Sequence, residues 1–228
     1  MRIDLKAKGI SLYSSPQSGP LDTIATTTSA FLMKNHLQVA INSGFFDPCC
    51  KAVAEPKDVM GLAISQGQLV SHPSSTSSYD VALVIRHGEA SIAHVSPVQS
   101  LKGIETAIAG SAIIVQDGRN NDTVNKLHGA DVSNPRTVIG LSKDHQYLYF
   151  VVIDGRKPGY SIGTTNVESA EIMLKIGAFT AMNVDGGGST AMIKDDGKGG
   201  FITVNKPSGG KERWDAIQLG VRAMPLRK

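Results

Sequence analysis

The sequence predicts a single domain of the α+β class, with a mixed, mostly antiparallel sheet, hairpins and two main helices. Hydrophobic residues make up 41% of the 228 residues, which is enough for a packed core. Most apolar segments are short and come in pairs joined by polar or glycine-containing turns, as in β-hairpins. Only two segments have the apolar spacing of a helix, and no repeat or linker divides the chain. We therefore expect one domain over residues 1–228.

The first half of the chain predicts one helix and several strands. Residues 21–35 have apolar side chains that can share one helical face, although their threonines weaken the helix propensity. Two later segments are apolar on both sides of a polar turn, which is typical of hairpins. The expected elements are a helix at 21–35, a buried strand at 37–42, hairpins at 59–71 and 81–95, and one strand at 107–115.

The second half predicts a long loop, one helix and further strands. The polar stretch over 119–135 has no periodicity and exceeds the ~12–15 residues usual for a structureless loop, which favours a functional loop or lid. Thr165 and Glu168 have the spacing of a capping box, so a helix should begin there and end at about Gly177. The remaining elements expected are a hairpin at 137–153 and strands at 179–184, 191–194, 201–204 and 216–223.

Composition and charge exclude several classes of partner. No run approaches the ~18 apolar residues of a membrane span, so we expect no membrane association. The net charge is only +3 and aromatic residues make up 5%, which argues against a nucleic-acid partner. Residues 1–6 lack the apolar core of a signal peptide, which predicts a cytoplasmic protein, with a trimmed secreted form as the open alternative. The sequence does not predict the oligomeric state.

The cysteines and histidines do not predict a transition-metal site. Cys49 and Cys50 are adjacent, and Cα atoms ~3.8 Å apart lie below the ~4.4–6.8 Å range of ordinary disulfides, so we expect two free thiols. Two thiols are too few for a zinc site, and the six histidines have no metal-ligand spacing. We expect no required cofactor, while a structural calcium ion held by carboxylates and backbone oxygens stays open.

The segment from Asn183 to Thr190 is the strongest candidate site. An apolar strand ends at Asp185, and three glycines then allow the backbone to turn sharply or to approach a ligand closely. Successive free backbone N–H groups in such a turn can bind an anion. The alternative is a glycine-rich hairpin turn in which Asp185 caps the backbone.

Three other strand ends carry polar candidates. The carboxylate of Asp154 ends one apolar strand, and the alternative to catalysis is a turn residue paired with Arg156. Arg136 stands at a strand entrance, where its forked donors could hold a phosphate or carboxylate, unless it is a simple surface arginine. Asn42 ends a buried strand and could hydrogen-bond a ligand. Together these residues predict a cleft for a polar, partly anionic substrate.

Four motifs follow one another along the chain: Asn42-Ser43-Gly44-Phe45-Phe46, Pro135-Arg136-Thr137 with Ile139-Gly140, Asp154-Gly155-Arg156, and Asp185-Gly186-Gly187-Gly188-Ser189-Thr190. In this order they resemble the phosphodiester glycosidase family. The similarity extends from Asn42 to the C-terminus, whereas residues 1–40 match weakly. Ser43, where the family more often has glycine, and Trp214, where smaller residues are usual, depart from the pattern without removing a functional side chain.

The resemblance implies one phosphodiester glycosidase-like domain that hydrolyses the bond between a sugar's anomeric carbon and a phosphodiester. The substrate would be a small molecule or glycan carrying a sugar 1-phosphate, such as an N-acetylglucosamine 1-phosphodiester or a nucleotide sugar. A phosphate leaving group is a stable anion that arginine and backbone N–H groups can hold, so it needs little proton donation. The oxocarbenium-like transition state still favours a nearby carboxylate.

The resemblance also implies roles for individual residues. Asp185 and Asp154 are the expected catalytic pair, one as base or nucleophile and the other as acid or orienting group, in either order. Glu168 is a third candidate carboxylate, with its place in the capping box as the structural alternative. Arg213 is expected to pair with Glu212 at the cleft rim. The expected substrate-binding residues are Asn42, Gly44, Arg136, Thr137, Arg156, Gly186, Gly187, Gly188, Ser189, Thr190 and Arg213.

Two other functions remain as alternatives. One is a non-catalytic module that binds glycans or sugar phosphates, which would bind such ligands without releasing product. The other is a phosphodiesterase that breaks the P–O bond, which would place the oxygen of water in the phosphate product instead of the sugar.

Overall fold

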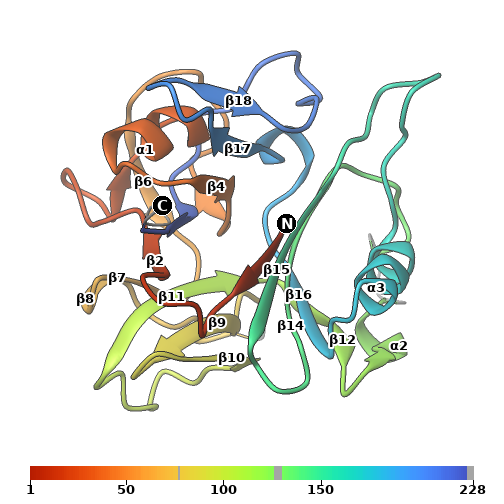
Figure 1. Ribbon diagram of the computed structural model, residues 1–228, viewed down its shortest axis with the longest axis horizontal. Coiled ribbons are helices and arrows are strands. Elements are labelled where there is room, and N and C mark those ends of the chain that lie inside the picture. The colour runs from red at the N-terminus through yellow and green to blue at the C-terminus, as the bar shows by residue number, and fades with distance from the viewer. Residues whose placement is uncertain (77, 126–129, 225–228) are drawn as a thin grey trace.

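The structure is a computed structural model that describes residues 1–76, 78–125 and 130–224. Figure 1 shows one sheet with α1 (Thr28–Lys34) at the upper left, a second across the bottom, and a third at the right with α3 (Asn166–Lys175) on its outer side. Every strand pair in the described part of the chain is antiparallel. The predicted α+β class, with a mostly antiparallel sheet and two main helices, is confirmed.

Each larger sheet is named after a central strand. The β14 sheet has the order β1 (Arg2–Asp4), β15 (Tyr147–Ile153), β14 (Arg136–Leu141), β16 (Thr180–Asn183), β12 (Ala112–Gln116) and β13 (Arg119–Asn120). The β9 sheet has the order β10 (Glu89–His94), β9 (Val81–Arg86), β11 (Ile104–Gly110), β7 (Ala63–Ser65) and β8 (Gln68–Ser71). The β4 sheet has the order β18 (Phe201–Thr203), β17 (Met192–Asp195), β4 (Val39–Asn42), β19 (Gln218–Arg222) and β2 (Ser11–Ser14). A small fourth sheet has the order β3 (Thr23–Ile24), β6 (Pro56–Val59) and β5 (Phe46–Asp47).

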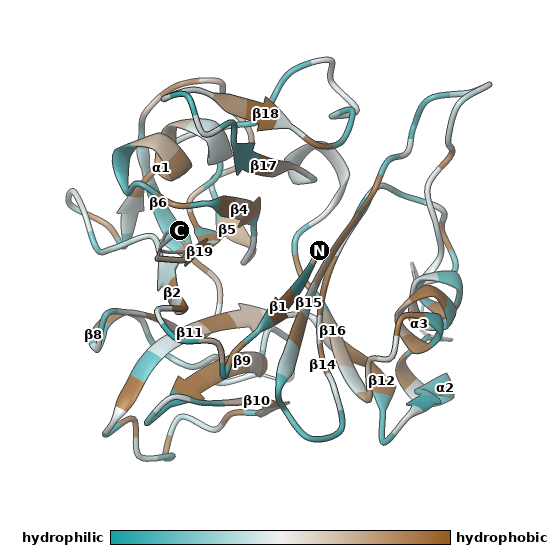
Figure 2. Cartoon of the chain, viewed as in Figure 1, coloured by the Kyte–Doolittle hydropathy of each residue, from teal (hydrophilic) through white to brown (hydrophobic). Residues whose placement is uncertain are grey.

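One cluster of buried apolar side chains joins the three larger sheets. Ile41 of β4, Ile108 of β11 and Ile139 of β14 all belong to it, and each is fully buried. A second cluster packs Met173 of α3 against the outer face of the β14 sheet. Figure 2 shows the same distribution, with hydrophobic residues concentrated in β4, β9 and β12. The shared core holds the strand ends of the β4 and β14 sheets next to each other.

The apolar segment predicted as one strand at 107–115 forms two strands in different sheets. β11 ends at Gly110 in the β9 sheet, and β12 begins at Ala112 in the β14 sheet. At Gly110 a Cβ would lie 2.5 Å from the carbonyl oxygen of Asn183, which also accepts the N–H of Ser111 at 2.9 Å. The prediction was wrong because both strands are buried, so hydropathy does not change where the chain passes between sheets.

Helix α1 is shorter than the predicted helix at 21–35. The hydroxyl of Thr27 accepts the N–H of Ala30 at 3.2 Å and caps the helix, which covers only Thr28–Lys34. Residues 23–24 instead form β3 and pair with β6. The prediction was wrong over the first residues because a threonine hydroxyl begins the helix later than the apolar pattern indicates.

Helix α3 begins and ends as predicted. Thr165 and Glu168 form a reciprocal capping box, in which Glu168 N–H donates to Thr165 Oγ1 at 3.2 Å and Thr165 N–H to Glu168 Oε2 at 2.8 Å. The helix ends at Lys175, and Gly177 adopts a φ of 97°, which favours glycine.

The polar stretch over 119–135 has regular structure at its ends. β13 pairs with β12, and α2 (Asp122–Asn125) follows it. Asn134 forms a backbone bridge with Thr164. Residues 126–129 lie outside the described residues, so a lid in this stretch stays a prediction.

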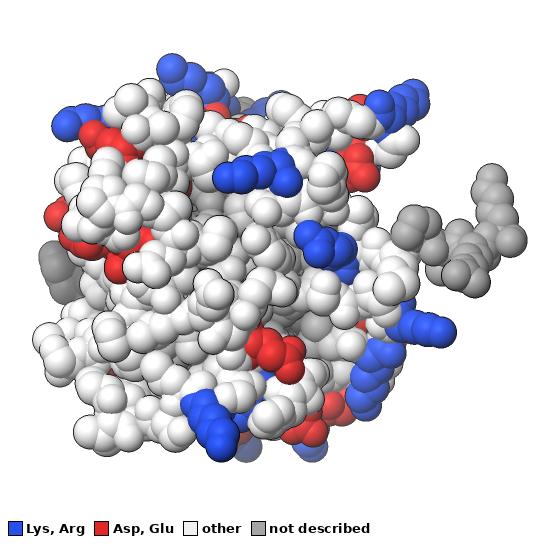
Figure 3. Space-filling view, turned by 90° about the vertical axis from the view of Figure 1, so that its left-hand side faces the viewer, with Lys and Arg blue, Asp and Glu red and all other residues white. Residues whose placement is uncertain are grey.

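No helix in residues 1–76, 78–125 or 130–224 is long and apolar enough to cross a membrane. Figure 3 shows the face on the side of α1, where lysine and arginine are interspersed with aspartate and glutamate around a broad uncharged area.

The side chain of Asn42 links the β4 sheet, the β14 sheet and the turn after β16. It is fully buried at the end of β4. Its Oδ1 accepts hydrogen bonds from Thr137 Oγ1 at 2.7 Å and from Ala191 N–H at 3.1 Å. Its Nδ2 donates to the carbonyl oxygen of Asp185 at 2.5 Å. One amide therefore fixes the position of the Asp185 backbone relative to both sheets.

We expect Asn42→Leu to destabilise the protein by about 3 kcal/mol or more, because it leaves three buried polar groups without partners at about 1–3 kcal/mol each. Thr137→Val is the matched control and should cost about 1 kcal/mol, since Asn42 keeps two of its three hydrogen bonds. Urea unfolding of both variants measures the difference. Equal losses of unfolding free energy in the two variants would show that the other hydrogen bonds of the Asn42 amide do not stabilise the protein.

Candidate functional site

Five segments distant in sequence, one of them contributing Phe45, meet in one pocket of about 270 Å³, which we call the first pocket. Asp185 follows β16 and Arg136 begins β14, while Arg156 lies in the loop after β15 and Arg213 in the loop before β19. Glycines 186–188 also line it. The structure thus brings these predicted residues together at the boundary between the β14 and β4 sheets.

The carboxylate of Asp185 is half-buried in this pocket. Its backbone is held on both sides, because Asp185 N–H donates to Ser43 O at 2.8 Å and its carbonyl oxygen accepts from Asn42. Burial raises the pKa of the Asp185 carboxyl to about 6, although hydrogen bonding by Ser189 and the positive charge of Arg213 oppose the shift. The carboxyl therefore titrates close to neutral pH.

Asp215 is a second carboxyl at the site, and the sequence analysis missed it. It is buried three positions before β19 begins at Gln218, and its Oδ1 accepts a hydrogen bond from Ser189 Oγ at 2.8 Å. Burial raises its pKa well above the ordinary value, and the charge of Asp185 acts in the same direction. The available sequence signal was its position: like Arg136, it stands at the entrance of a buried apolar strand.

Ser189 connects the second carboxyl to Arg213. The Nη1 of Arg213 donates to Ser189 Oγ at 3.2 Å, and Ser189 Oγ donates onward to Asp215. Ser189 is fully buried, so this chain of contacts lies behind the turn that carries Asp185. It orients the guanidinium of Arg213 without neutralising it.

The three arginines of the pocket form no ion pair with a carboxylate in the described residues. Arg136 donates from Nε to Thr164 O at 3.0 Å and from Nη2 to Val132 O at 2.8 Å. Burial and the nearby charge of Arg156 lower the pKa of Arg136. Because their hydrogen bonds go to neutral oxygens, the guanidinium groups keep their charge available for an anion.

Arg156 has a backbone conformation that is rare for arginine. Its φ is 58°, in the left-handed region, which non-glycine residues seldom adopt outside constrained sites. Its Nε and Nη2 both donate to Asn134 Oδ1, at 3.1 and 3.0 Å. Arg156 does not form the alternative ion pair with Asp154. Its guanidinium lies against the glycine turn instead.

The glycines of the turn let two guanidinium groups approach the backbone. A Cβ at Gly187, whose φ is 59°, would lie 3.0 Å from Nη2 of Arg156. A Cβ at Gly188 would overlap the guanidinium of Arg213. Alanine at either position would therefore displace an arginine.

The turn does not expose a series of free N–H groups. Gly187 N–H donates to Pro135 O at 2.8 Å, and Ser189 N–H to Gly186 O at 3.1 Å. Gly186 N–H hydrogen-bonds the carboxylate of Asp185. The expected use of successive N–H groups for an anion is thus wrong for this turn, since most of them are already bonded, and the positive charge comes from the arginines instead.

Asp154 is half-buried, and its carboxylate accepts hydrogen bonds from the segment that follows β18 of the β4 sheet. Its carboxylate accepts hydrogen bonds from Tyr160 Oη at 2.9 Å, Asn205 Nδ2 at 3.0 Å and Lys206 N–H at 2.9 Å. These contacts join the loop after β15 to the segment after β18. Asp154 does not line the first pocket, and its role as an acid stays a prediction.

Glu168 serves the capping box of α3 and does not line the first pocket. Four of the predicted binding residues are buried and do not line the first pocket: Asn42, Thr137, Ser189 and Thr190. Gly44 packs against Ile217, where a Cβ would lie 3.0 Å from Ile217 Cγ2. These residues position the site, while contact with substrate stays a prediction for them.

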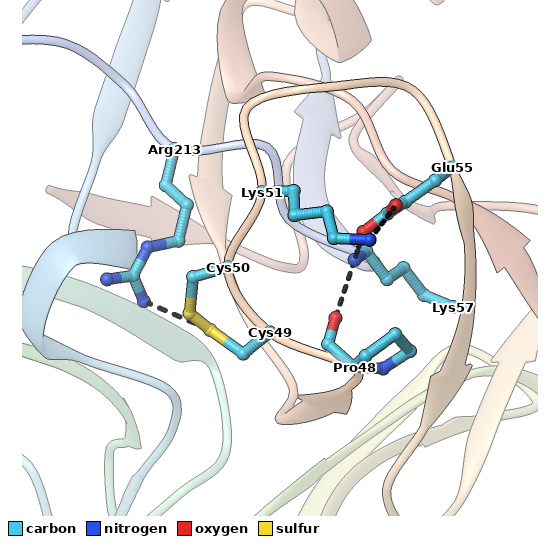
Figure 4. A network of polar contacts seen from close by, with 7 residues as sticks. All are labelled: Pro48, Cys49, Cys50, Lys51, Glu55, Lys57 and Arg213. Atoms are coloured by element: carbon cyan, nitrogen blue, oxygen red, sulfur yellow. Dashed lines mark hydrogen bonds and ion pairs between the residues drawn. A yellow bond between two sulfur atoms is a disulfide. The ribbon is translucent and has the colours of Figure 1, made fainter.

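Cys49 and Cys50 are joined in a disulfide, which corrects the expectation of two thiols. That expectation applied the Cα range of ordinary disulfides, and the Cα atoms of these adjacent residues, linked by a cis peptide, lie 3.2 Å apart and outside that range. Figure 4 shows the disulfide beside Arg213, whose Nη1 lies 3.8 Å from Cys49 Sγ. The cysteines therefore belong to the rim of the site.

A buried lysine anchors the loop that carries the cysteines. Lys57 is fully buried, and its Nζ donates to Pro48 O and to Glu55 Oε1, each at 2.5 Å (Figure 4). Lys51 shares the same carboxylate, with its Nζ 3.4 Å from Glu55 Oε2. Glu212 does not pair with Arg213 as expected, because it accepts a hydrogen bond from Ser29 N–H at 2.8 Å at the start of α1.

No group of three or more histidine, cysteine or acidic side chains that could hold a metal ion occurs among the described residues. Backbone oxygens can also bind calcium, so the alternative of a structural calcium ion stays a prediction.

The fold resembles several solved structures. The catalytic domain of zebrafish N-acetylglucosamine-1-phosphodiester alpha-N-acetylglucosaminidase, auto-inhibited by its pro-peptide, matches with a TM-score of 0.69 at 20% identity over 95% of this chain and 74% of that chain. A Synechocystis protein matches with a TM-score of 0.67 at 14% identity over 98% of this chain and 58% of that one. A Burkholderia pseudomallei protein matches with a TM-score of 0.68 at 16% identity, over 97% and 72% of the two chains.

Sequence comparison identifies the family. No curated protein sequence matches this chain. The family model for phosphodiester glycosidases matches residues 35–222, which include all four motifs and Asp215. Of the N-terminal segment 1–40 that carries little of the motif resemblance, residues 1–34 lie outside this range and residues 35–40 lie within it. The chain therefore belongs to the phosphodiester glycosidase family.

Proposed function

We propose that this chain is a hydrolase that cleaves the bond between the anomeric carbon of a sugar and a phosphodiester oxygen. The observation that carries the proposal is the first pocket, where one half-buried carboxylate lies among three guanidinium groups that form no ion pair within the described part of the chain. Membership in the family supports the reaction class. The name of the zebrafish enzyme suggests an N-acetylglucosamine 1-phosphodiester as the first substrate to test.

Arg156 and Arg213 are the groups that would hold the phosphate. Both lie against the glycine turn beside Asp185, and their hydrogen bonds go to uncharged groups. As the C1–O bond breaks, the electron pair leaves with the phosphate oxygen, and the resulting phosphomonoester is a stable anion. Charge stabilisation by the arginines therefore replaces much of the work of a general acid.

Asp185 is the carboxylate that would act at the anomeric carbon. In its ionised form it would stabilise the positive charge that develops there and either attack C1 or take a proton from the water that does. Burial and the charge of Asp185 raise the pKa of Asp215, which accepts a hydrogen bond from Ser189 behind the reacting carboxylate. Asp215 would then orient Ser189 and Arg213.

Asp154 would support activity by holding neighbouring segments in place and not by reacting with the substrate. Its hydrogen bonds to Tyr160 and to the backbone of Lys206 connect the two segments that flank the pocket. This role differs from the acid or base predicted from the motif. The activity of Asp154→Asn distinguishes the two roles.

We expect the protein to release free sugar from an N-acetylglucosamine 1-phosphodiester and Asp185→Asn to lower kcat about 10³-fold, as for loss of a catalytic acid–base group. Asp154→Asn should reduce activity much less, because asparagine retains part of the hydrogen bonding. Sugar release measured in ¹⁸O-labelled water should place the label in the sugar.

Three outcomes contradict this assignment. Label in the phosphate would identify a phosphodiesterase, and binding without turnover would identify a binding module. If Asp154→Asn lowered kcat as much as Asp185→Asn does, Asp154 would be a catalytic partner of Asp185, as the sequence predicts.

Activity should fall below about pH 6, because protonation of Asp185, whose pKa is about 6, removes the reacting carboxylate. A pH profile of kcat/KM should therefore show a rising acid limb near this value. A profile that instead declines as pH rises through 6 would show that the protonated form is the active one.

Asp185→Asn should also change how stability depends on pH. The folded pKa of about 6 exceeds the ordinary value of 3.8, so the stability contributed by protonated Asp185 is present at low pH and lost as pH rises through about 6. The variant should gain stability relative to the wild type between pH 4 and pH 7, by up to about 3 kcal/mol.

The control for this measurement is Asp196→Asn. Hydrogen bonds from the backbone N–H groups of Lys198 and Gly200 lower the pKa of Asp196, so its replacement should give no such gain as the pH rises. Urea unfolding at several pH values compares both variants, and a pH-independent difference for Asp185→Asn would contradict the raised pKa.

A further inference from the structure

A second pocket of about 340 Å³ adjoins the first. The two pockets share Arg156, Gly188 and Arg213. Asp185 lines only the first pocket, whereas Lys211 and Trp214 line only the second. The pair of guanidinium groups that would hold the phosphate therefore lies at the junction between two compartments of different chemistry.

This arrangement assigns opposite ends of a bound phosphodiester to the two pockets, on the basis of the proposed function. A phosphate at the junction places the sugar on the side of Asp185. The group esterified to the other side of the phosphate then extends into the second pocket.

The second pocket has an excess of positive charge. Lys211 is exposed and forms no ion pair in the described residues. Lys51 is paired with Glu55, but Glu55 is also bound by the fully buried Lys57, so two lysines share one carboxylate. The carboxylate of Glu212, the acidic residue in the lining, points to Ser29 N–H. Two shared arginines and two lysines thus attract more negative charge than one phosphodiester carries.

The second pocket also contains the single tryptophan of the chain. Trp214 is half-buried in the lining, next to Arg213. An indole ring offers a flat apolar face on which a planar or sugar ring can stack. Because the chain has no other tryptophan, its fluorescence reports on this pocket alone.

We propose that the second pocket is a specificity subsite for leaving groups that carry a second phosphate next to the scissile one. Lys51 and Lys211 bind the additional negative charge, and Trp214 packs against a ring attached to it. The preferred substrates are then sugar 1-diphosphate esters, with nucleoside diphosphate sugars as members of that class.

The first test compares three substrates with the same sugar. N-acetylglucosamine 1-(methyl phosphate) has one charge, the methyl ester of N-acetylglucosamine 1-diphosphate adds the second phosphate, and UDP-N-acetylglucosamine adds a ring as well. We expect kcat/KM to rise about tenfold from the first to the second substrate. A further rise for the third would measure the contribution of Trp214, and its loss in Trp214→Leu would assign it.

The double variant Lys51→Gln/Lys211→Gln should abolish most of the preference for the second phosphate. Lys198→Gln is the control for loss of a lysine charge elsewhere, because it removes one such charge from an exposed loop outside both pockets and should leave the preference unchanged. Unfolding curves of the variants check that each is folded.

A binding measurement separates the subsite from catalysis. UDP should change the fluorescence of Trp214, and competition by inorganic pyrophosphate and by inorganic phosphate gives the affinity of each. We expect pyrophosphate to bind at least tenfold more tightly than phosphate, and the double variant to remove this difference.

The outcomes distinguish the two proposals. If no sugar is released from any substrate but pyrophosphate still binds more tightly through Lys51 and Lys211, the proposed reaction fails and the subsite stands. If sugar is released equally well from the first two substrates, or if the double variant leaves the preference intact, the subsite is overturned while the reaction stands.

Discussion

The buried amide of Asn42 is the contact on which the candidate site depends. It accepts hydrogen bonds from the β14 sheet and from the chain entering β17, and it donates to the carbonyl oxygen of Asp185. A buried amide of this kind is stable only when its donors and acceptors are satisfied, so the three segments are held in one arrangement. The Asp185 backbone is thereby fixed where the β14 and β4 sheets meet.

The carboxyl groups and the arginines around Asp185 are not paired with one another in ion pairs within the described residues. Burial disfavours the charged form of Asp185 and Asp215, while the arginines beside them bind neutral oxygens. Such an arrangement contributes little to folding, since taking charged groups out of water costs free energy. It is suited to a ligand that brings its own negative charge, because the phosphate completes the pairing that the protein leaves open.

The sequence predicted the strands and the helix at the site better than it predicted the contacts made by their ends. Asp185, Arg136 and Arg156 stand at or just beyond strand ends, and the continuous apolar runs next to them made those ends visible in the sequence. Asp215 was missed because a lone aspartate before an apolar run has many uses, and only its contact with Ser189 distinguishes it. The change of sheet at Gly110 was missed because buried strands of two sheets have the same hydropathy, and the cysteine pairing because the Cα range of ordinary disulfides was applied to adjacent residues.

The sequence by itself determined the fold class, the capping box of α3 and the family, because each depends on local spacing or on ordered motifs. Only the tertiary structure decided which charged residues meet. Asp154 and Asp185 look equivalent in sequence, yet one is bonded to the chain after β18 and the other faces the arginines. The physical reason is that burial and distance set the strength of a charge interaction, and neither quantity is encoded in the neighbouring residues of the chain.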